Sequence, residues 1–169
     1  MKKQSIAGKK KVVVAVSGGF DPLHVGHARL FQKAKALGDY LVVILNNDNW
    51  LRKKKRQAFM PEQERKEIIE ALAVVDKVVL TNHPKNPADM SVCAELKKIR
   101  PHIFAQGGDR TKQDGRNLSS SQNPEVNLCA KLGIKIIYNV GHGGKVQSSS
   151  WLLAKYVESS QSEERLREA

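Results

Sequence analysis

Two histidines, His24 and His27, are the residues of this chain whose type and spacing best suit catalysis. They lie three positions apart, so both rings fall on one face if they open a helix. Gly26 leaves room between them for a ligand against the backbone, and Gly18 and Gly19 upstream allow a sharp turn close to the same ligand. Two imidazole donors beside the unpaired N–H groups of a helix start predict a site for a phosphoryl group.

The same residues allow plainer interpretations. A His-x-x-His pair can be a solvated helix start or half of a metal site. A glycine turn followed by an acidic residue after the second strand is also how NAD is held, which would make Asp48 a contact to ribose. However, the spacing G-x-G-x-x-G is absent, because Phe20, Asp21 and Pro22 follow the glycine pair. An NAD-dependent oxidoreductase is therefore a poor second interpretation, and we expect Asp48 to be a turn or helix-cap residue.

The elements that must position these residues alternate along the chain. The continuous apolar run Val12–Val16 predicts a parallel strand that is buried on both faces. Further strands are predicted over residues 40–45, 78–80, 102–106 and 134–138, and helices over residues 25–37, 61–73, 90–100, 124–132 and 148–158. This alternation predicts an α/β fold, a Rossmann-like, doubly wound sheet of about five parallel strands flanked by helices. Such sheets bind ligands at the carboxyl ends of their strands, near the topological switch point.

The ten residues from Gly18 to His27, GGFDPLHVGH, resemble the H-x-G-H signature of the nucleotidyltransferase superfamily. That superfamily includes cytidylyltransferases, such as glycerol-3-phosphate cytidylyltransferase, and the adenylyltransferase domain of ADP-heptose synthase. The similarity extends from about Val12 to Leu153. It implies a cytidylyltransferase-like enzyme that moves a nucleoside monophosphate from CTP or ATP to a phosphorylated small molecule, either a sugar phosphate or a polyol phosphate, and releases pyrophosphate. It also implies Mg²⁺ on the triphosphate itself, and we expect no metal site made by the protein.

The resemblance also implies where the nucleotide binds. His24 and His27 would donate hydrogen bonds to the α-phosphate, and Ser148–Ser150 would hold the β- and γ-phosphates, although serines at a helix start normally only cap it. The stretch AQGGDR looks like the G-G-D turn of the heptose adenylyltransferases, which lies near the base and sugar. The implied nucleotide contacts are Gly18, Gly19, Phe20, Asp21, His24, Gly26, His27, Gly108, Asp109, Ser148, Ser149 and Ser150.

Five consecutive cations, at positions 52–56, follow the second predicted strand. Residues that match Lys54, Arg56 and Arg65 contact phosphates in glycerol-3-phosphate cytidylyltransferases. The resemblance therefore implies that these three bind the acceptor and that Lys54 and Arg65 are catalytic together with the histidines. We interpret residues 52–57 as an extended loop that closes as a lid, with Lys54 and Arg56 facing the substrate. A plainer interpretation, a solvated basic patch, is kept for Arg52, Lys53 and Lys55.

Two positions depart from the cytidylyltransferase pattern. The arginine that the pattern places upstream of the serines is Gly143, and the basic residue expected after them is Leu153. His142, Lys145 and Lys155 are candidates to supply the missing charge. The choice between CTP and ATP and the identity of the acceptor therefore stay open.

The chain has 169 residues and a formal charge of +12, which favours anionic partners. We expect one nucleotidyltransferase domain over residues 12–158, a flexible basic tail over residues 1–11 and a polar tail or helix end over residues 159–169. A basic RNA-binding module is an alternative, but 5% aromatic residues leave few stacking platforms, so nucleic acid is not an expected partner. A catalytically weak nucleotide-binding protein is a second alternative, and a homodimer stays open.

Cysteine usage and hydropathy indicate the cellular compartment in which we expect the protein. Cys93 and Cys129 lie far apart with no C-x-x-C spacing, so we expect reduced, buried thiols. The apolar run before Ser17 is too short for a signal peptide, and no apolar stretch approaches the roughly 18 residues of a membrane span. We therefore expect a cytoplasmic protein that has no membrane partner.

Overall fold

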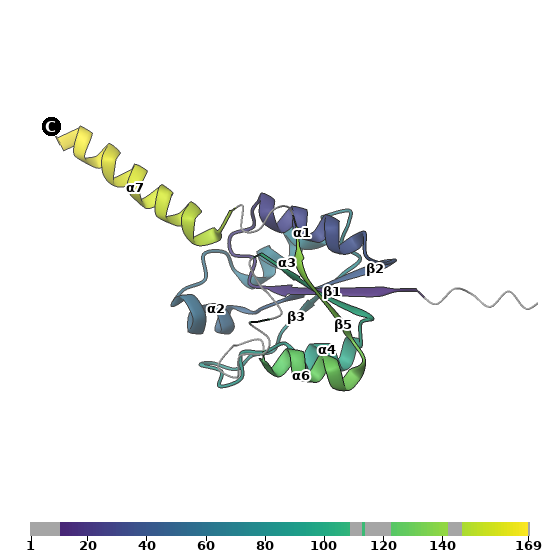
Figure 1. Ribbon diagram of the computed structural model, residues 1–169. Coiled ribbons are helices and arrows are strands. Elements are labelled where there is room, and N and C mark those ends of the chain that lie inside the picture. Colours follow the sequence, from purple (N-terminus) through teal and green to yellow (C-terminus); the bar gives the residue numbers. More distant parts are fainter. Residues whose placement is uncertain (1–10, 109–112, 114–122, 142–146, 169) are drawn as a thin grey trace, which may run out of the picture.

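The computed structural model describes residues 11–108, 113, 123–141 and 147–168, with only the backbone for residues 123 and 160–168. Five strands form one parallel sheet in the order β3-β2-β1-β4-β5 (Figure 1). The strands are β1 (Val13–Gly18), β2 (Tyr40–Leu45), β3 (Lys77–Leu80), β4 (Ile103–Gly107) and β5 (Lys135–Val140). This order, with β1 in the middle, confirms the predicted Rossmann-like, doubly wound sheet.

Helices cover both faces of the sheet (Figure 1). α1 (Val25–Lys35) and α3 (Glu62–Glu70) contribute to the apolar cluster on one face, and α4 (Cys93–Ile99) and α6 (Asn123–Leu132) to the cluster on the other. α2 (Asp48–Lys55) follows β2, and α7 (Ser149–Glu168) runs away from the sheet. The five predicted helices are confirmed, but α7 continues to residue 168 instead of ending near residue 158, and α2 is not among them.

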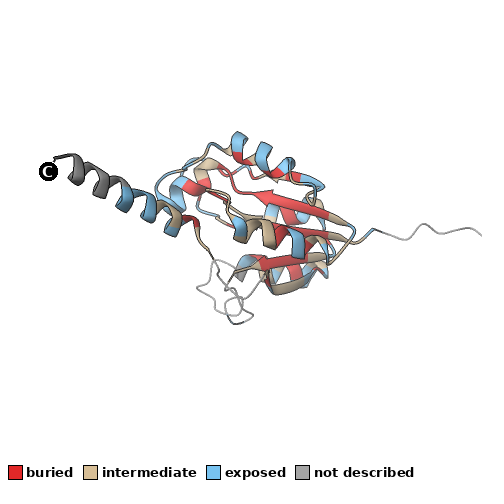
Figure 2. Ribbon diagram, turned by 90° about the horizontal axis from the view of Figure 1, so that it is seen from above, coloured by how far each residue is buried: buried red, intermediate tan, exposed pale blue. Residues whose placement is uncertain are grey.

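The two faces of the sheet pack on separate apolar clusters. Figure 2 shows buried residues along the strands between the two helix layers. Val16 of β1 packs with Phe31 of α1 in one cluster, and Ala15 of β1 packs with Leu96 of α4 in the other. All four side chains are completely buried. Each large apolar side chain buried in this way stabilises the fold by about 1.5–3 kcal/mol. Burial on both faces explains why the strands are continuous apolar runs.

The sheet opens at the topological switch point between β1 and β4. β1 pairs with β2 along its whole length, whereas its pairing with β4 ends at Ala15 and Phe104. The connections that leave the two strands therefore diverge, which makes room for a ligand at the carboxyl edge. The pairing of β4 with β5 also shifts register between Ala105 and Gly107, and such bulges are common beside active sites.

The predicted loop over residues 52–57 is wrong, because α2 continues to Lys55. The Asn47 side chain caps this helix by accepting a hydrogen bond from the Trp50 amide at 3.1 Å. Trp50 and Leu51 are buried, so two adjacent apolar residues anchor one side of an otherwise polar helix. Helical geometry separates side chains that an extended chain would align, so Lys54 and Arg56 do not face the same way.

The two cysteines are free thiols, and burial affects both. Burial raises the pKa of the Cys129 thiol to about 12. Cys93, at the start of α4, is only partly buried, and burial is the main cause that raises the pKa of its thiol. A raised pKa leaves little reactive thiolate, so both residues are suited to packing.

Hydropathy of the helices adds one observation. Within the described ranges of the chain, none of the helices combines the length and apolar character that crossing a membrane requires.

Candidate active site

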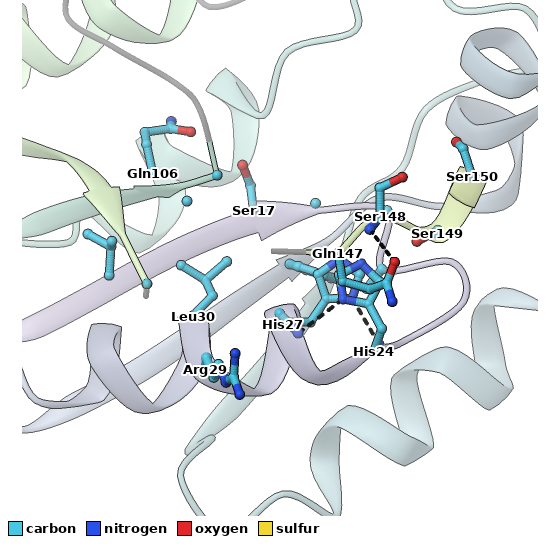
Figure 3. A pocket seen from close by; sticks show the side chains of 18 of the residues that line it. Ser17, His24, His27, Arg29, Leu30, Gln106, Gln147, Ser148, Ser149 and Ser150 are labelled. Atoms are coloured by element: carbon cyan, nitrogen blue, oxygen red, sulfur yellow. Dashed lines mark hydrogen bonds between the residues drawn. The ribbon is translucent and has the colours of Figure 1, made fainter. Parts of the chain in front are cut away.

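Loops at the carboxyl edge of the sheet surround a cavity of about 360 Å³ (Figure 3). It lies between the start of α1, the ends of β1, β4 and β5, and the start of α7, which is the edge expected from the topology. Among its lining residues are eleven of the predicted site residues: Gly18, Gly19, Phe20, His24, Gly26, His27, Lys54, Gly108, Ser148, Ser149 and Ser150. The lining also includes Gly107, from the predicted G-G-D turn, and residues that were not predicted: Ser17, Arg29, Leu30, Lys55, Gln106, Val140, Gly141 and Gln147. The predicted Asp109 lies outside the described residues.

The side chains of His24 and His27 together cap the start of α1. His24 is the N-cap, and its Nδ1 accepts a hydrogen bond from the Gly26 amide at 3.1 Å. The Nδ1 of His27 accepts a hydrogen bond from the His24 amide at 3.3 Å. The result is a reciprocal capping box built from two imidazoles, where a serine and a glutamate are usual. The rings stack with their centroids 3.6 Å apart.

These capping bonds fix the tautomer of both rings. A ring nitrogen that accepts a hydrogen bond carries no proton, so neutral His24 and His27 hold their proton on Nε2. Burial, followed by the charges of His24 and Lys55, lowers the pKa of His27 to about 3. Burial, followed by the charge of Lys55, also lowers the pKa of His24. Near neutral pH the pair therefore offers two neutral Nε2–H donors at the cavity.

The glycine pair is required by close packing behind the cavity. A Cβ on Gly18 would lie 2.8 Å from the ring of Phe20, and a Cβ on Gly19 would lie 2.7 Å from the side chain of Leu51. Phe20 has a φ of 48° and turns its buried ring edge-on to His27, with the ring centroids 5.0 Å apart. Gly18 thus lets the Phe20 ring support His27 from the protein interior, and Gly19 lets the turn pack against Leu51.

Asp21 positions a loop instead of lining the cavity. Its side chain is buried, and its carboxylate accepts hydrogen bonds from the amides of Phe59 and Met60, each at 2.8 Å. These bonds tie the β1–α1 loop to the connection between α2 and α3. The expected contact between Asp21 and the nucleotide is therefore not supported by the geometry.

Arg65 of α3 is completely buried, and its guanidinium is engaged by protein acceptors. It donates to the carbonyls of Gly19 and Asn46 at 2.6 and 2.9 Å. It also donates to the Met60 carbonyl at 3.0 Å and forms an ion pair with Asp48 at 2.7 Å. This geometry contradicts the expected catalytic and acceptor-binding contacts of Arg65, which instead joins the ends of β1 and β2 to α2 and α3. Asp48 is accordingly the partner of Arg65.

Two of the five consecutive cations line the cavity, namely Lys54 and Lys55. Lys55 donates to the Asp21 carbonyl at 3.1 Å, and burial is the main cause that lowers the pKa of its ammonium. The Lys54 ammonium lies 4.6 Å from the ring centroid of Trp50. Arg56 ends α2 with a φ of 70° and is not among the described lining residues. Lys54 and Lys55 therefore both line the cavity, whereas Arg56 is not among its described lining residues, and the phosphate contacts of Lys54 and Arg56 stay predictions.

The three serines at the start of α7 line the cavity, and two of them also have structural bonds. Ser148 Oγ accepts a hydrogen bond from the Trp151 amide at 3.2 Å, which is the cap that a serine usually forms. Ser149 Oγ donates to the Pro22 carbonyl at 2.9 Å and so joins α7 to the β1–α1 loop. Leu153 lines a smaller neighbouring cavity. Gly143, His142 and Lys145 lie outside the described residues.

The cavity is suited to a polyanion. Its described lining contains Arg29, Lys54 and Lys55 and has no Asp or Glu. The positive ends of the α1 and α7 helix dipoles add partial positive charge. Over the described ranges there is no group of three or more His, Cys, Asp and Glu side chains that could hold a metal ion. The positive charge of the lining suits a triphosphate.

The topology and this site together define a class, the Rossmann-like domains that hold a nucleotide across the switch point of a parallel sheet. Within that class, residues 15–128 match the profile of the family described as cytidylyltransferase-like. The chain belongs to this family of nucleotidyltransferases.

Relatives of two kinds are similar to the chain. The bifunctional protein HldE of Pelobacter propionicus is 38% identical over 134 residues, which cover 77% of this chain and 26% of that protein. The FAD synthase of Pyrococcus abyssi is 38% identical over 106 residues, which cover 62% of this chain and 68% of that protein. The chain thus spans only about a quarter of the HldE relative.

One solved structure adds to this picture. The lipopolysaccharide core biosynthesis protein from Thermoplasma volcanium has a TM-score of 0.62 and 26% identity to this chain. The alignment covers 79% of this chain and 100% of that protein.

Proposed function

We propose that this chain is an adenylyltransferase, which transfers the adenylyl group of ATP to the phosphate of a small phosphorylated acceptor. An oxygen of the acceptor phosphate attacks the α-phosphorus of ATP and forms a new P–O bond. The bond from the α-phosphorus to the oxygen that bridges to the β-phosphorus breaks, and pyrophosphate leaves with that oxygen. The observation that carries this proposal is the pair of neutral Nε2–H donors, from His24 and His27, beside a helix start.

Two observations support ATP over CTP as the nucleotide. The FAD synthase relative makes, by its name, a product that contains an adenylyl group, and the resemblance to ADP-heptose synthase points to transfer of the same group. Gly143 also stands where the cytidylyltransferase pattern has an arginine. The acceptor proposed here is a sugar phosphate, a polyol phosphate or a related phosphate ester.

The histidines stabilise the charge that develops on the α-phosphate. Each Nε2–H donates to an α-phosphate oxygen without giving up its proton, so the pair acts through electrostatics and not through acid–base chemistry. The capping bonds hold both rings in place before the substrate binds, so little reorganisation accompanies the reaction. One well-placed donor of this kind is worth about 3 kcal/mol, which corresponds to roughly a hundredfold in rate.

The start of α7 and two lysines hold the remaining phosphates. Ser148–Ser150 and the N–H groups beside them bind the β- and γ-phosphates. Lys54 binds the acceptor phosphate, and Lys55 neutralises charge on the triphosphate. Magnesium enters as part of the substrate, bound to the phosphate oxygens of ATP, where it offsets their charge.

Pyrophosphate release tests this proposal. The purified chain is assayed with magnesium and with ATP, CTP, GTP or UTP against sugar phosphates, polyol phosphates and flavin mononucleotide. We expect acceptor-dependent release that is at least about tenfold faster with ATP than with the other nucleotides. Faster release with CTP would contradict the choice of nucleotide, and no acceptor-dependent release with any nucleotide would contradict nucleotidyl transfer.

A further inference from the structure

A second cavity, of about 500 Å³, lies between α2 and the connection from β3 to α4. Its described lining consists of five side chains: Asn49, Arg52 and Lys53 of α2, and Lys85 and Asn86 of the connection. None of these five lines the active-site cavity. The next two residues of α2, Lys54 and Lys55, do line the active site. α2 therefore contributes cations to two separate cavities.

Hydrogen bonds hold the two walls of this second cavity together. The side-chain amides of Asn47 and Asn49 each donate to the His83 carbonyl at 2.9 Å. The Trp50 indole donates to the Met90 carbonyl at 2.8 Å. These three bonds join α2 to the connection near both of its ends. The walls are thus set before a ligand binds, so little ordering of the backbone accompanies binding.

Positive charge gathers at this cavity, and its described lining has no Asp or Glu. The Arg52 guanidinium lies 3.5 Å from the Asp48 carboxylate, but Asp48 also pairs with Arg65 at the shorter distance of 2.7 Å. Asp48 therefore offsets only part of the Arg52 charge. The like charges of Arg52, Lys53 and Lys85 repel one another, and an anion between them would relieve this repulsion.

The hydrogen-bonding groups of the lining are mostly donors. A guanidinium has five N–H donors, an ammonium has three and a side-chain amide has two. Lys53 uses one of its donors for the Asn86 oxygen, which joins two of the lining residues. Cationic donors of this kind recognise phosphate oxygens. The described lining has no aromatic side chain on which a base could stack, so the cavity suits a phosphate-rich ligand better than a nucleotide.

We propose that this cavity is a second phosphate site, which binds a small ligand that carries two phosphate groups. One phosphate ester carries about −1.5 to −2 charges near neutral pH, so two phosphates match three cations better than one does. Pyrophosphate and bisphosphorylated sugars share this chemistry. The site is independent of the proposed function, because the two cavities have no lining residue in common.

NMR titration of the ¹⁵N-labelled full chain follows the two cavities separately. Backbone amide signals of Lys85 and Asn86 report on the second site, and those of Gly26 and Ser148 report on the active site. The probes are pyrophosphate, fructose 1,6-bisphosphate, inorganic phosphate and AMP, without magnesium and at about 0.15 M salt. We expect pyrophosphate or the bisphosphate to bind the second site with a Kd below about 1 mM, and at least about tenfold more tightly than inorganic phosphate and AMP. The tighter of the two identifies how the two phosphates are linked.

Variants assign this binding to its side chains. Lys53→Met and Lys85→Met should each weaken binding at the second site by about tenfold and leave the active-site titration unchanged. Arg52→Lys keeps the charge but loses the planar fork, so it should weaken binding by at least about threefold. Lys33→Met, the same loss of charge at an exposed position of α1, is the matched control and should have no effect. All four side chains are exposed, so we expect these variants to fold like the parent chain.

Several outcomes would overturn the second site. One is that no probe shifts the Lys85 and Asn86 signals, or that pyrophosphate shifts only the active-site signals. Another is that inorganic phosphate or AMP binds as tightly as both probes with two phosphates. Equal losses from Lys33→Met and Lys53→Met would indicate a diffuse basic patch instead. Because these signals are separate from those of the active site, the second site fails or stands whether or not the chain releases pyrophosphate from ATP.

Discussion

In each histidine of the active site, one ring nitrogen has a structural role and the other has a chemical role. The Nδ1 atoms of His24 and His27 complete the cap of α1, and this leaves the Nε2–H groups for the substrate. The caps need an unprotonated Nδ1, and burial lowers the pKa of both rings and so keeps them in that neutral form. Local structure and catalytic electrostatics therefore depend on the same two side chains.

Replacing either histidine should affect the rate more than substrate binding. We expect His24→Ala and His27→Ala each to lower kcat for adenylyl transfer by at least about a hundredfold, because a donor aimed at the transition state acts mainly on rate. Steady-state kinetics measures this, with circular dichroism to confirm folding. His102→Ala is the matched control, because His102 is exposed and bonds to Val13 at the amino end of β1. Near-normal turnover in either site variant would remove that histidine from the mechanism.

The low pKa of His27 predicts how stability depends on pH. An unfolded histidine has a pKa of 6.5, whereas folding lowers the pKa of His27 to about 3. Between these values only the unfolded chain binds the proton, so the free energy of unfolding increases with pH across this window and falls as pH drops from 6.5 towards 3. NMR of the His27 ring should show a neutral Nε2–H tautomer at neutral pH that persists down to about pH 5. A ring that titrates near pH 6.5 would contradict the burial that lowers this pKa.

At the scale of elements, the helical form of α2 places consecutive positive charges on different sides of the helix. Lys55 lines the active-site cavity, whereas Lys53 donates to the Asn86 side chain at 2.5 Å beside a separate cavity. We expect Lys55→Ala to lower kcat/KM for ATP by at least about a hundredfold and Lys53→Ala to change it by no more than about threefold. Kinetics at low and high salt separates the two cases. Equal losses that fade together as salt is raised would indicate a diffuse basic patch.

Arg65 has a structural role at the scale of elements, because it holds together the strands and helices that form the site. Arg65→Met should lower the free energy of unfolding by about 3–5 kcal/mol, since it leaves Asp48 without its buried partner. Urea denaturation measures the change. Lys66→Met, next to it on α3, removes a partly exposed ion pair with Glu70 and should cost no more than about 1 kcal/mol. If the two variants lose equal stability, the buried network does not hold the elements together.

At the scale of the whole molecule, the fold could be predicted because the alternation of strands and helices extends along the whole sequence. Continuous apolar runs alternating with amphipathic helices leave few topologies, and one of them places the glycine turn at the centre of a parallel sheet. α2 was missed because a run of cations favours a solvated loop, and only the burial of Trp50 and Leu51 reveals the helix. Ser17 and Gln106 directly precede the two glycine turns, and counting alternation from Ala15 and Phe104 would have placed both on the same face of the sheet. Nothing local signals that Arg65 is buried.

The measurement that tests the central claim most directly follows the two ends of ATP separately. The chain is incubated with magnesium, a sugar phosphate and ATP labelled with ³²P at either the α- or the γ-phosphate. The account predicts that the α-label appears in an acceptor product joined through a diphosphate and that the γ-label appears only in pyrophosphate. Transfer of the γ-label to the acceptor, or release of the α-label as free AMP with no labelled product, would contradict it.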